Sequence, residues 1–389
     1  RPQRMNPGNN SNSLMTVVWI LVAFVLLVVG GLIIAEATPL VLPPAASAEA
    51  VQVDELFKIL MALGGSIWLL VQGAVIYSVI RFRARPGDDS DGVAMHGNST
   101  LEFVWTLIPS ITVVILSIIS FQVWVNITTA QDNPQVVEAR GARFLWSFSY
   151  DIPGETQRVN STVLHTWVGQ PVVLHLETAD VNHAFWVPSM RIKQDLLAGR
   201  RTEARFTPIL AGEYPVVCAE LCGSGHGDMH ASIVVHEDEA SFLDWFDDEA
   251  YIILNPPDDP AEGGQLLMTA GGVAGLYACA GCHTLEALGW DAIVAPNLEG
   301  VADRAATRVP GMEVERYLLR SLFFPGEFLA PGYDNLMPQH QYQDPEEANY
   351  MPLDEALNIV AYLCTLSASG ESACNVDMLP DMMTDMGMG

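Results

Sequence analysis

The sequence predicts a multidomain membrane protein with N-terminal transmembrane helices, an all-β domain outside the membrane and an all-α domain at the C-terminus. Three observations predict this architecture. The 389 residues are 50% hydrophobic and only 16% charged, which is more apolar than a soluble protein usually is. Three stretches without charged residues are long enough to cross a bilayer as helices. After them the chain changes to short alternating segments and then to segments with helical periodicity.

The membrane region is expected to occupy residues 1–127. It contains three apolar stretches, and we expect transmembrane helices near 14–35, 57–80 and 103–126. The first stretch, together with "AASAEA" at 45–50, also fits a secretory signal that is not cleaved. Its apolar run is longer than the core of a usual signal, which favours a third helix.

The distribution of arginines predicts how these helices are oriented. Arg1 and Arg4 precede the first stretch and three arginines follow the second, whereas residues 36–55 between them contain no basic residue. Because basic residues concentrate in cytoplasmic loops, the N-terminus is expected in the cytoplasm and everything after about residue 128 outside it. This pattern fits a multi-pass protein of a bacterial inner membrane, with its larger domains on the periplasmic side.

Residues 128–250 carry the pattern of an all-β domain. Segments such as "RFLWSFSY", "PVVLHLE" and "ASIVV" alternate apolar and polar side chains and are separated by Gly, Pro, Asp and Asn. Short strands at this spacing predict an antiparallel sandwich or barrel. Residues 251–264, rich in Pro, Gly and acids, are typical of a linker. Helical periodicity then covers residues 265–370, and residues 371–389 form a methionine-rich tail.

The net charge argues against one class of partner. The formal charge of −28 comes from 46 acidic and 18 basic residues, and residues 250–389 alone hold 20 acids and 4 bases. Such an acidic surface repels nucleic acid and suits a cation or a basic protein. We therefore expect no nucleic-acid partner, whereas the apolar stretches require a lipid bilayer.

The segment "CAGCH" predicts covalently bound haem. Cys279 and Cys282 have the spacing that attaches the vinyl groups of a c-type haem, and His283 follows as an axial iron ligand. The segment "NLMPQ" supplies Met337 as the expected second axial ligand, with Met351, in a similar "MP" dipeptide, as the alternative. Ligation by histidine and methionine fills both axial positions and suits an electron carrier.

The segment "CAELCGSGHGDM" concentrates four side chains that bind metals. Cys218, Cys222, His226 and Met229 raise the possibilities of a disulfide, a zinc site, a redox copper site or coincidence. Methionine is a poor zinc ligand, whereas thiolate, imidazole and thioether together favour copper. His183, in "DVNHAFWVP", offers a second imidazole at the end of an expected strand. A single blue-copper ion uses only one cysteine, so two thiolates and two imidazoles are more donors than it needs. This set of donors fits two coppers bridged by two sulfurs.

These segments resemble a known family. "DVNHAFWVPSMRIKQD" and "CAELCGSGHGDM" are similar to the two signature segments of subunit II of haem-copper cytochrome oxidases, which carries the dinuclear CuA centre. "HGNSTLEFVWTLIP" is similar to the start of that family's second helix, and "CAGCH" resembles the branch with a fused C-terminal cytochrome c. The resemblance implies a cupredoxin-like Greek-key barrel for the β domain and an all-α cytochrome c domain at the C-terminus.

The resemblance also implies roles for individual residues. Two sulfurs would bridge the coppers, each histidine would bind one copper, and the methionine would be a weak ligand. The implied copper ligands are His183, Cys218, Glu220 through its backbone carbonyl, Cys222, His226 and Met229. The Glu220 side chain would face a magnesium ion shared with subunit I. Glu102 would match a carboxylate near a proton-uptake path in that subunit.

The chain departs from the family pattern in two places. An extra N-terminal helix is not typical of the family. Phe144 stands where the family has a tryptophan associated with electron transfer from soluble cytochrome c, while Trp146 is kept. Phe144 is therefore open to interpretation as an electron-path aromatic or as ordinary packing. A haem tethered to the chain would make docking of a mobile donor here unnecessary, because a linker raises the local donor concentration to roughly millimolar.

The remaining two cysteines, Cys364 and Cys374, have no role in binding copper or haem in this scheme. An oxidising compartment favours a disulfide between them, which would pin the last helix to the tail. Free thiols are the alternative.

The function that follows is an electron relay. The chain would be the subunit through which electrons enter a haem-copper terminal oxidase, passing from an external donor through haem c to CuA and on to haem in subunit I. Oxygen would be reduced to water there, with proton pumping, so no catalytic residue is expected in this chain. Partners would be subunit I, other oxidase subunits, and a donor that is either a basic soluble carrier or a quinol-oxidising complex. The alternatives are the same subunit in a CuA-containing nitric-oxide reductase, or a membrane-tethered electron carrier without an oxidase.

Overall fold

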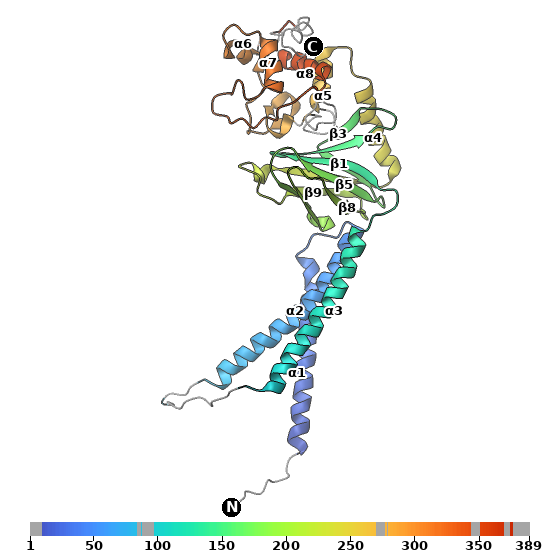
Figure 1. Ribbon diagram of the computed structural model, residues 1–389, viewed down its shortest axis with the longest axis vertical. Helices are drawn as coiled ribbons and strands as arrows, with labels where there is room; N and C mark the ends of the chain where they lie inside the picture. The colour runs from blue at the N-terminus through green and yellow to red at the C-terminus, as the bar shows by residue number, and fades with distance from the viewer. Residues whose placement is uncertain are drawn as a thin grey trace, which may run out of the picture. The chain divides into compact units, whose positions relative to one another are not determined.

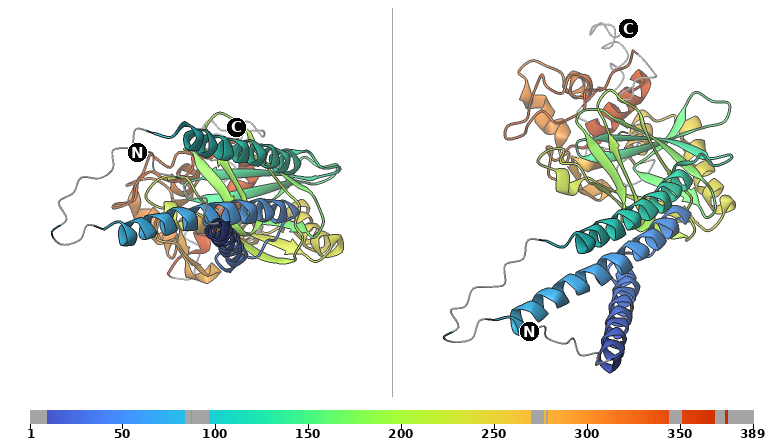
Figure 2. Two further views of the ribbon diagram at one scale, coloured as in Figure 1. Left: turned by 90° about the horizontal axis from the view of Figure 1, so that it is seen from below. Right: turned by 60° about the horizontal axis from the view of Figure 1, so that its bottom comes forward.

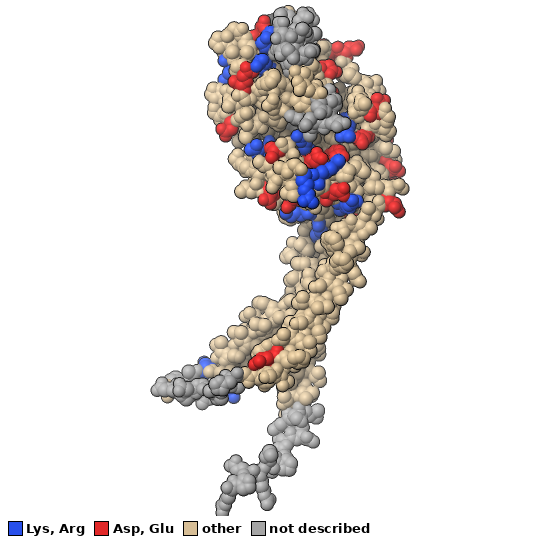
Figure 3. Space-filling model, viewed as in Figure 1, with Lys and Arg blue, Asp and Glu red and all other residues tan. Residues whose placement is uncertain are grey.

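The computed structural model describes residues 10–83, 87, 97–269, 277, 279–343, 351–368 and 374–375 (Figure 1). The chain divides into two compact units, Arg1–Thr129 and Ala130–Gly389. On the face drawn in Figure 3, charged side chains gather on the second unit, whereas the helices of the first are almost uncharged.

The first unit consists of long apolar helices. Within the part of the chain that the structure describes, three helices are long and apolar enough to span a membrane, with mean hydropathies between 2.0 and 3.2. The three apolar helices expected from the sequence are thus confirmed. The second begins before its apolar stretch, because the Ser47 side chain caps it by accepting a hydrogen bond from the Ala50 amide at 3.0 Å. The elements are α1 (Asn10–Ala37), η1 (Thr38–Leu40), α2 (Ala48–Arg81) and α3 (Ser99–Thr128).

Small side chains let α1 and α2 approach each other closely (Figure 2). A Cβ atom on Gly31 would lie 2.3 Å from the backbone oxygen of Ala62, so only glycine fits there. The Ser66 hydroxyl on α2 also donates a hydrogen bond to the backbone oxygen of Leu27 on α1, at 3.1 Å. Close backbone approach and interhelical hydrogen bonds are the means by which helices pack inside lipid.

The second unit begins with a sandwich of two five-stranded sheets, which confirms the expected β domain (Figure 1). The strand orders are β3-β2-β1-β5-β8 and β4-β10-β9-β6-β7. Burial alternates along β2, so that Trp146, Phe148 and Tyr150 face the core. The strands are β1 (Gln135–Ala142), β2 (Leu145–Asp151), β3 (Arg158–Ser161), β4 (Val163–Trp167), β5 (Val172–Thr178), β6 (His183–Val187), β7 (Ile192–Leu196), β8 (Thr202–Phe206), β9 (Gly212–Cys218) and β10 (His230–His236).

Two strand pairs correct the expected antiparallel arrangement. β1 pairs with β5 in parallel, and β4 pairs with β10 in parallel. Between β1 and β5 the chain contributes β4 to the other sheet, and between β4 and β10 it contributes β5 and β8 to the other sheet, before it returns in the same direction. Alternation of apolar residues identifies a strand but carries no information on the direction of its partner, so the sequence could not show this.

A helix, α4 (Glu239–Leu254), packs on the sandwich through aromatic side chains. Asp238 caps its N-terminus by accepting a hydrogen bond from the Ser241 amide at 2.9 Å. The ring of Trp245 stacks on that of His165 on β4, with centroids 3.7 Å apart. Tyr150 completes the contact, with its ring centroid 5.4 Å from that of Trp245.

The rest of the second unit, as far as the structure describes it, combines short helices with irregular segments and a two-stranded sheet, so it does not show the expected all-α fold. Both α4 and the following helix extend into the expected linker 251–264. The first and last helices of this region touch through their backbones, because a Cβ atom on Gly264 would lie 1.8 Å from the backbone oxygen of Asn358. The methionine-rich tail lies outside the described residues apart from 374–375. The elements are α5 (Pro260–Thr269), η4 (Cys279–Gly281), β11 (Thr284–Leu285), η5 (Glu286–Leu288), β12 (Trp290–Asp291), α6 (Val301–Arg308), α7 (Val314–Phe323) and α8 (Leu353–Thr365).

Candidate metal centre

Two distant segments of the β domain meet at one end of neighbouring strands. His183 is the first residue of β6, and Cys218 is the last residue of β9. Backbone pairing of the two strands aligns Phe185 with Cys218, and the amide of Ala219 donates to the oxygen of Ala184 at 3.0 Å. The sheet therefore places an imidazole from one segment beside a thiol from the other, 35 residues later.

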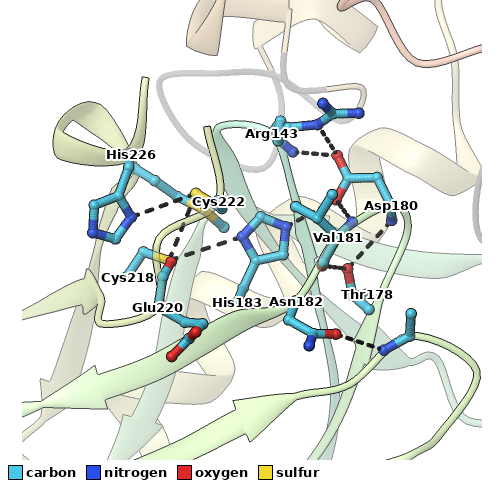
Figure 4. Close-up of polar contacts among 12 residues, drawn as sticks. Arg143, Thr178, Asp180, Val181, Asn182, His183, Cys218, Glu220, Cys222 and His226 are labelled. Carbon is cyan, nitrogen blue, oxygen red and sulfur yellow. Dashed lines mark hydrogen bonds and ion pairs between the residues drawn. The ribbon is translucent and has the colours of Figure 1, made fainter. Parts of the chain in front are cut away.

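The loop from β9 to β10 brings the other expected donors to the same place (Figure 4). The sulfur atoms of Cys218 and Cys222 lie 3.9 Å apart. Nδ1 of His183 lies 3.8 Å from the first sulfur, and Nδ1 of His226 lies 3.5 Å from the second. The sulfur of Met229 lies 3.9 Å from that of Cys222. Each cysteine thus has its own imidazole, with the two sulfurs between them.

Glu220 contributes its backbone to this cluster rather than its side chain. The thiol of Cys218 donates to the backbone oxygen of Glu220 at 3.2 Å. Figure 4 shows the Glu220 carboxylate pointing away from the sulfur atoms, and its residue is exposed. All six expected copper ligands are therefore brought together, with the carboxylate of Glu220 left on the surface.

The donor set fits a metal centre and not a disulfide. A sulfur separation of 3.9 Å is far beyond a disulfide bond of about 2.05 Å. Burial, together with the neighbouring Cys218 thiol, raises the pKa of Cys222 to about 12. Two adjacent buried thiolates are thus unfavourable unless a cation compensates their charge. Thiolate, imidazole and thioether donors together suit copper.

The orientation of His183 depends on two residues that sequence reasoning did not assign to the site. Nε2 of the buried His183 lies 2.9 Å from Oδ1 of Asp180. Oδ2 of Asp180 accepts from both the backbone amide and Nε of Arg143, at 3.0 and 2.9 Å. A proton on Nε2, held by this carboxylate, leaves the lone pair of Nδ1 directed at the sulfurs.

The carboxylate of Asp180 is kept ionised by its partners. Burial raises its pKa, but hydrogen bonds from His183, from the amides of Val181 and Arg143 and from the Arg143 guanidinium together hold the pKa well below its usual range. The spacing of three residues between Asp180 and His183 is a signal that could have identified the pair in the sequence. No comparable signal points to Arg143, which is 37 residues away.

The two aromatic residues singled out in the sequence both lie beside the cluster of candidate copper donors. A Cβ atom on Gly225 would lie 2.5 Å from Cδ2 of Phe144, so the loop between Cys222 and His226 closes on that ring only because residue 225 is glycine. Trp146 is buried, and its ring centroid lies 6.2 Å from that of His183.

A second candidate site is a cavity in the C-terminal part of the unit, of about 190 Å³. It is far larger than a void that holds a single water, so it has room for a ligand. Nδ1 of His283 lies 2.7 Å from the backbone oxygen of Pro296, which leaves Nε2 as the nitrogen free to bind a metal. The residues of the "CAGCH" segment and both candidate methionines line the cavity: Cys279, Cys282, His283, Met337 and Met351.

None of the remaining predicted residues is among the donors of the first cluster or the residues that line the cavity. On α3, Glu102 accepts from the amide of Asn98 at 3.0 Å, while the side chain of Asn98 accepts from the amide of Leu101 at 3.1 Å. Glu102 therefore helps to cap this helix. Cys364 and Cys374 are joined in a disulfide.

Two family models match the chain. The transmembrane domain of cytochrome c oxidase subunit II matches residues 35–123, and the periplasmic domain of the same subunit matches residues 155–237. The second range contains the whole cluster around Cys218 and Cys222. The cavity lined by Cys279 lies outside both ranges.

Individual relatives carry the same description. A protein named cytochrome c oxidase subunit 2 from Synechocystis sp. is 34% identical over 251 residues, which cover 52% of this chain and 74% of that protein. Its namesake from Thermostichus vulcanus is 34% identical over 257 residues, covering 52% and 77%. Among solved structures, the periplasmic domain of subunit II of cytochrome oxidase from Bradyrhizobium japonicum is 26% identical. It covers 31% of this chain and 96% of that domain, with a TM-score of 0.27.

Proposed function

The chain belongs to the cytochrome c oxidase subunit II family, and on this premise we propose that it is the subunit through which electrons enter a haem-copper terminal oxidase. Electrons from an external donor would pass through haem c to CuA and then to haem in subunit I, where oxygen is reduced to water and protons are pumped. The observation that carries the proposal is the pair of cysteine sulfurs, 3.9 Å apart, with one imidazole beside each.

A dinuclear copper centre fits the donors of the β domain. When bound, a copper pair supplies a one-electron carrier at this position. Cys218 and Cys222 would hold it between their sulfurs, His183 and His226 would bind from two sides, and Met229 would be a weak ligand. Cys218, Cys222 and Met229 are at most 5% exposed, and the strands on either side fix the loop that carries them. Such preorganised donors shift little when an electron arrives, which favours fast transfer.

A c-type haem fits the cavity of the C-terminal part. When bound, the haem supplies a second one-electron carrier. Cys279 and Cys282 would hold it by thioether bonds, and His283 would bind the iron through Nε2 while Pro296 keeps Nδ1 occupied. Met337 is the proposed second ligand and Met351 the alternative, since both line the same cavity. Residues 128–250 would then be the copper domain and residues 265–370 the cytochrome c domain.

We extend the proposal to two aromatic residues beside the copper donors. Phe144 packs on the copper-binding loop and Trp146 lies beside His183, so both are placed to shorten the distance an electron must cross. The alternative for Phe144 is ordinary packing. A Phe144→Leu variant that keeps its copper absorption but slows electron transfer to copper would support the first interpretation, and an unchanged rate would support the second.

The remaining assignments concern subunit I and the membrane. The exposed carboxylate of Glu220 would bind magnesium shared with subunit I, and Glu102 would lie near the start of a proton-uptake path. The chain would be a multi-pass protein of a bacterial inner membrane, with both electron carriers on the periplasmic side. Magnesium analysis of the purified oxidase with and without a Glu220→Gln substitution tests the first of these assignments.

The electron donor is proposed to be a basic soluble protein, because residues 250–389 hold 20 acids and 4 bases. Oxidase turnover should then fall as ionic strength rises, since salt screens long-range attraction. Turnover that is independent of salt would favour a quinol-oxidising complex bound directly.

Purification of the full chain with its partners tests the function as a whole. The unchanged protein should contain copper and haem c and should consume oxygen. A Cys218→Ser or His183→Ala substitution should abolish the near-infrared copper absorption and stop electron flow, while haem c stays reducible. Intact copper bands in either variant would refute the ligand set. Reduction of nitric oxide instead of oxygen would identify the reductase alternative, and purification without any haem-copper subunit would identify a tethered carrier.

A further inference from the structure

The turn between β1 and β2 contacts both candidate sites of the second unit. β1 ends at Ala142 and β2 begins at Leu145, so Arg143 and Phe144 form a two-residue turn. The turn and the residue after it contact groups of different sites. The backbone amide of Arg143 donates to Asp180, and the side chain of Leu145 lines the cavity that Cys282 also lines.

On the copper side, the turn controls a carboxylate that holds a ligand. Arg143 donates twice to Oδ2 of Asp180, whose other oxygen lies 2.9 Å from Nε2 of His183 (Figure 4). The exposed fraction of the side chains falls along this series, from 38% for Arg143 to 22% for Asp180 and 0% for His183. A surface guanidinium therefore compensates the charge of a carboxylate that orients a fully buried ligand.

On the other side, the turn contacts the haem-attachment segment. Leu145 lines the cavity together with Cys279 and Cys282. A Cβ atom on Gly281, between these cysteines, would lie 3.4 Å from Cδ2 of Leu145, which is ordinary contact distance. The segment that would carry haem thus contacts the first residue of β2 in the proposed copper domain.

We propose that the turn Arg143–Leu145 is the surface on which the chain's own haem-attachment segment docks, and that Arg143 is a positioning residue that links this surface to the copper ligand His183. The inference rests on the proposed function, because it assigns residues to the transfer from haem c to copper. In that transfer one electron would pass from the reduced haem iron to the copper pair, with no bond made or broken. Arg143 would hold Asp180 against His183 and so set both the geometry and the charge around the acceptor.

The test uses the full chain loaded with copper and haem and compares Arg143→Gln with Arg143→Lys. At a fixed ambient potential, the ratio of oxidised to reduced copper should rise on the order of tenfold in Arg143→Gln. The substitution keeps the backbone hydrogen bond but removes the charged one, which leaves the charge of the Asp180 carboxylate uncompensated beside the more positive oxidised state. Arg143→Lys, which keeps the charge, should restore the ratio in part. The matched control is Arg158→Gln, which removes a cation paired with Asp151 on another strand and should leave the ratio unchanged.

Docking is tested separately by Leu145→Ala, measured as the rate of copper reduction after rapid reduction of the haem. The rate should fall on the order of tenfold, because a small displacement of one partner is costly for transfer, while the copper ratio stays as in the unchanged protein. Unchanged ratios in Arg143→Gln would overturn the role of Arg143, and an unchanged rate in Leu145→Ala would overturn the docking surface. Absence of copper or haem from the unchanged chain would instead refute the proposed function.

Discussion

The copper cluster and the haem-type cavity are built in different ways. His183 and Cys218 stand at the ends of paired strands, so the backbone hydrogen bonds of a sheet bring them together. The cavity around His283 is lined largely by loops and helix ends, and its walls come from residues as far apart as Leu145 and Leu363. The comparison teaches that strand pairing alone positions donors of the first site, whereas the second is a space among loops and helix ends that the proposed haem would fill.

The largest effect is expected when haem attachment is removed. Replacing Cys279 and Cys282 with serine should release the haem and destabilise the C-terminal helices by about 4 kcal/mol or more, because a tightly bound ligand stabilises only the folded state. Limited proteolysis of the full chain should then cut within residues 279–343, while the strands β1 to β10 resist cleavage.

The matched control removes the other ligand. Cys218→Ser should abolish copper absorption and leave the sandwich as resistant to protease as before, because its core does not depend on the metal. Rapid cleavage of the copper-free sandwich would show that the two sites do not differ in this way.

The second effect distinguishes the two methionines of the cavity. Met337 is partly buried, whereas Met351 is 1% exposed and belongs to the core. Met337→Ala should abolish the absorption that arises from sulfur bound to haem iron. Met351→Ala should keep that absorption and lower the free energy of unfolding by about 2–5 kcal/mol, as large-to-small core substitutions do. If only Met351→Ala lost the absorption, Met351 would be the iron ligand and Met337 the packing residue.

A third, smaller effect concerns the loop that carries the copper donors. Gly225→Ala should push the loop away from Phe144 and weaken copper retention roughly tenfold, as changes that support ligands commonly do. Phe144→Ala in the same chain should restore retention by making room. Gly227→Ala is the control, since a Cβ atom there meets nothing within 4 Å. Equal copper loss in both alanine variants would contradict the steric explanation.

The smallest effect is a pH dependence located away from both sites. Nδ1 of His165 lies 3.1 Å from Nε2 of His236, and burial followed by this neighbour lowers the pKa of His165 to about 3. The unfolded chain, with a histidine pKa of about 6.5, binds more protons between these values, so stability falls as the pH drops from about 6.5 towards about 3. The slope for His165 alone is at most about 1.4 kcal/mol per pH unit.

Thermal melting of the β signal between pH 7.5 and 4 checks this expectation. His165→Phe keeps a ring stacked on Trp245 but removes the titrating group, so the melting midpoint should depend less on pH. The exposed His230 offers a control, and His230→Gln should leave the dependence unchanged. A steeper dependence in His165→Phe would contradict the assignment.

The candidate copper ligands could be predicted from the sequence because their chemistry is concentrated. Four of the donor side chains fall within residues 218–229, and few metals suit that combination. Arg143 and Asp180 could not be assigned in the same way. Neither is a copper ligand, and they meet only because a turn and a loop 37 residues apart lie at the same end of the sandwich.

The fold was predictable to the extent that it depends on local pattern. Charge-free stretches identified the membrane helices, and alternation identified the β domain. The parallel pairing of β1 with β5 and of β4 with β10 depends on how the chain crosses between sheets, which no local pattern records. The early start of α2 depends on the single cap at Ser47, placed before a polar turn that hydropathy does not mark.

The contact between α5 and α8 has a consequence for the order of biosynthesis. Gly264 and Asn358 lie 94 positions apart in the sequence, so this contact cannot form until α8 has emerged from the ribosome. At ordinary synthesis rates, the stretch between Cys282 and α8 takes on the order of several seconds to appear. During that interval the "CAGCH" segment is not yet enclosed by α8 and stays accessible, as the proposed covalent attachment of haem would require.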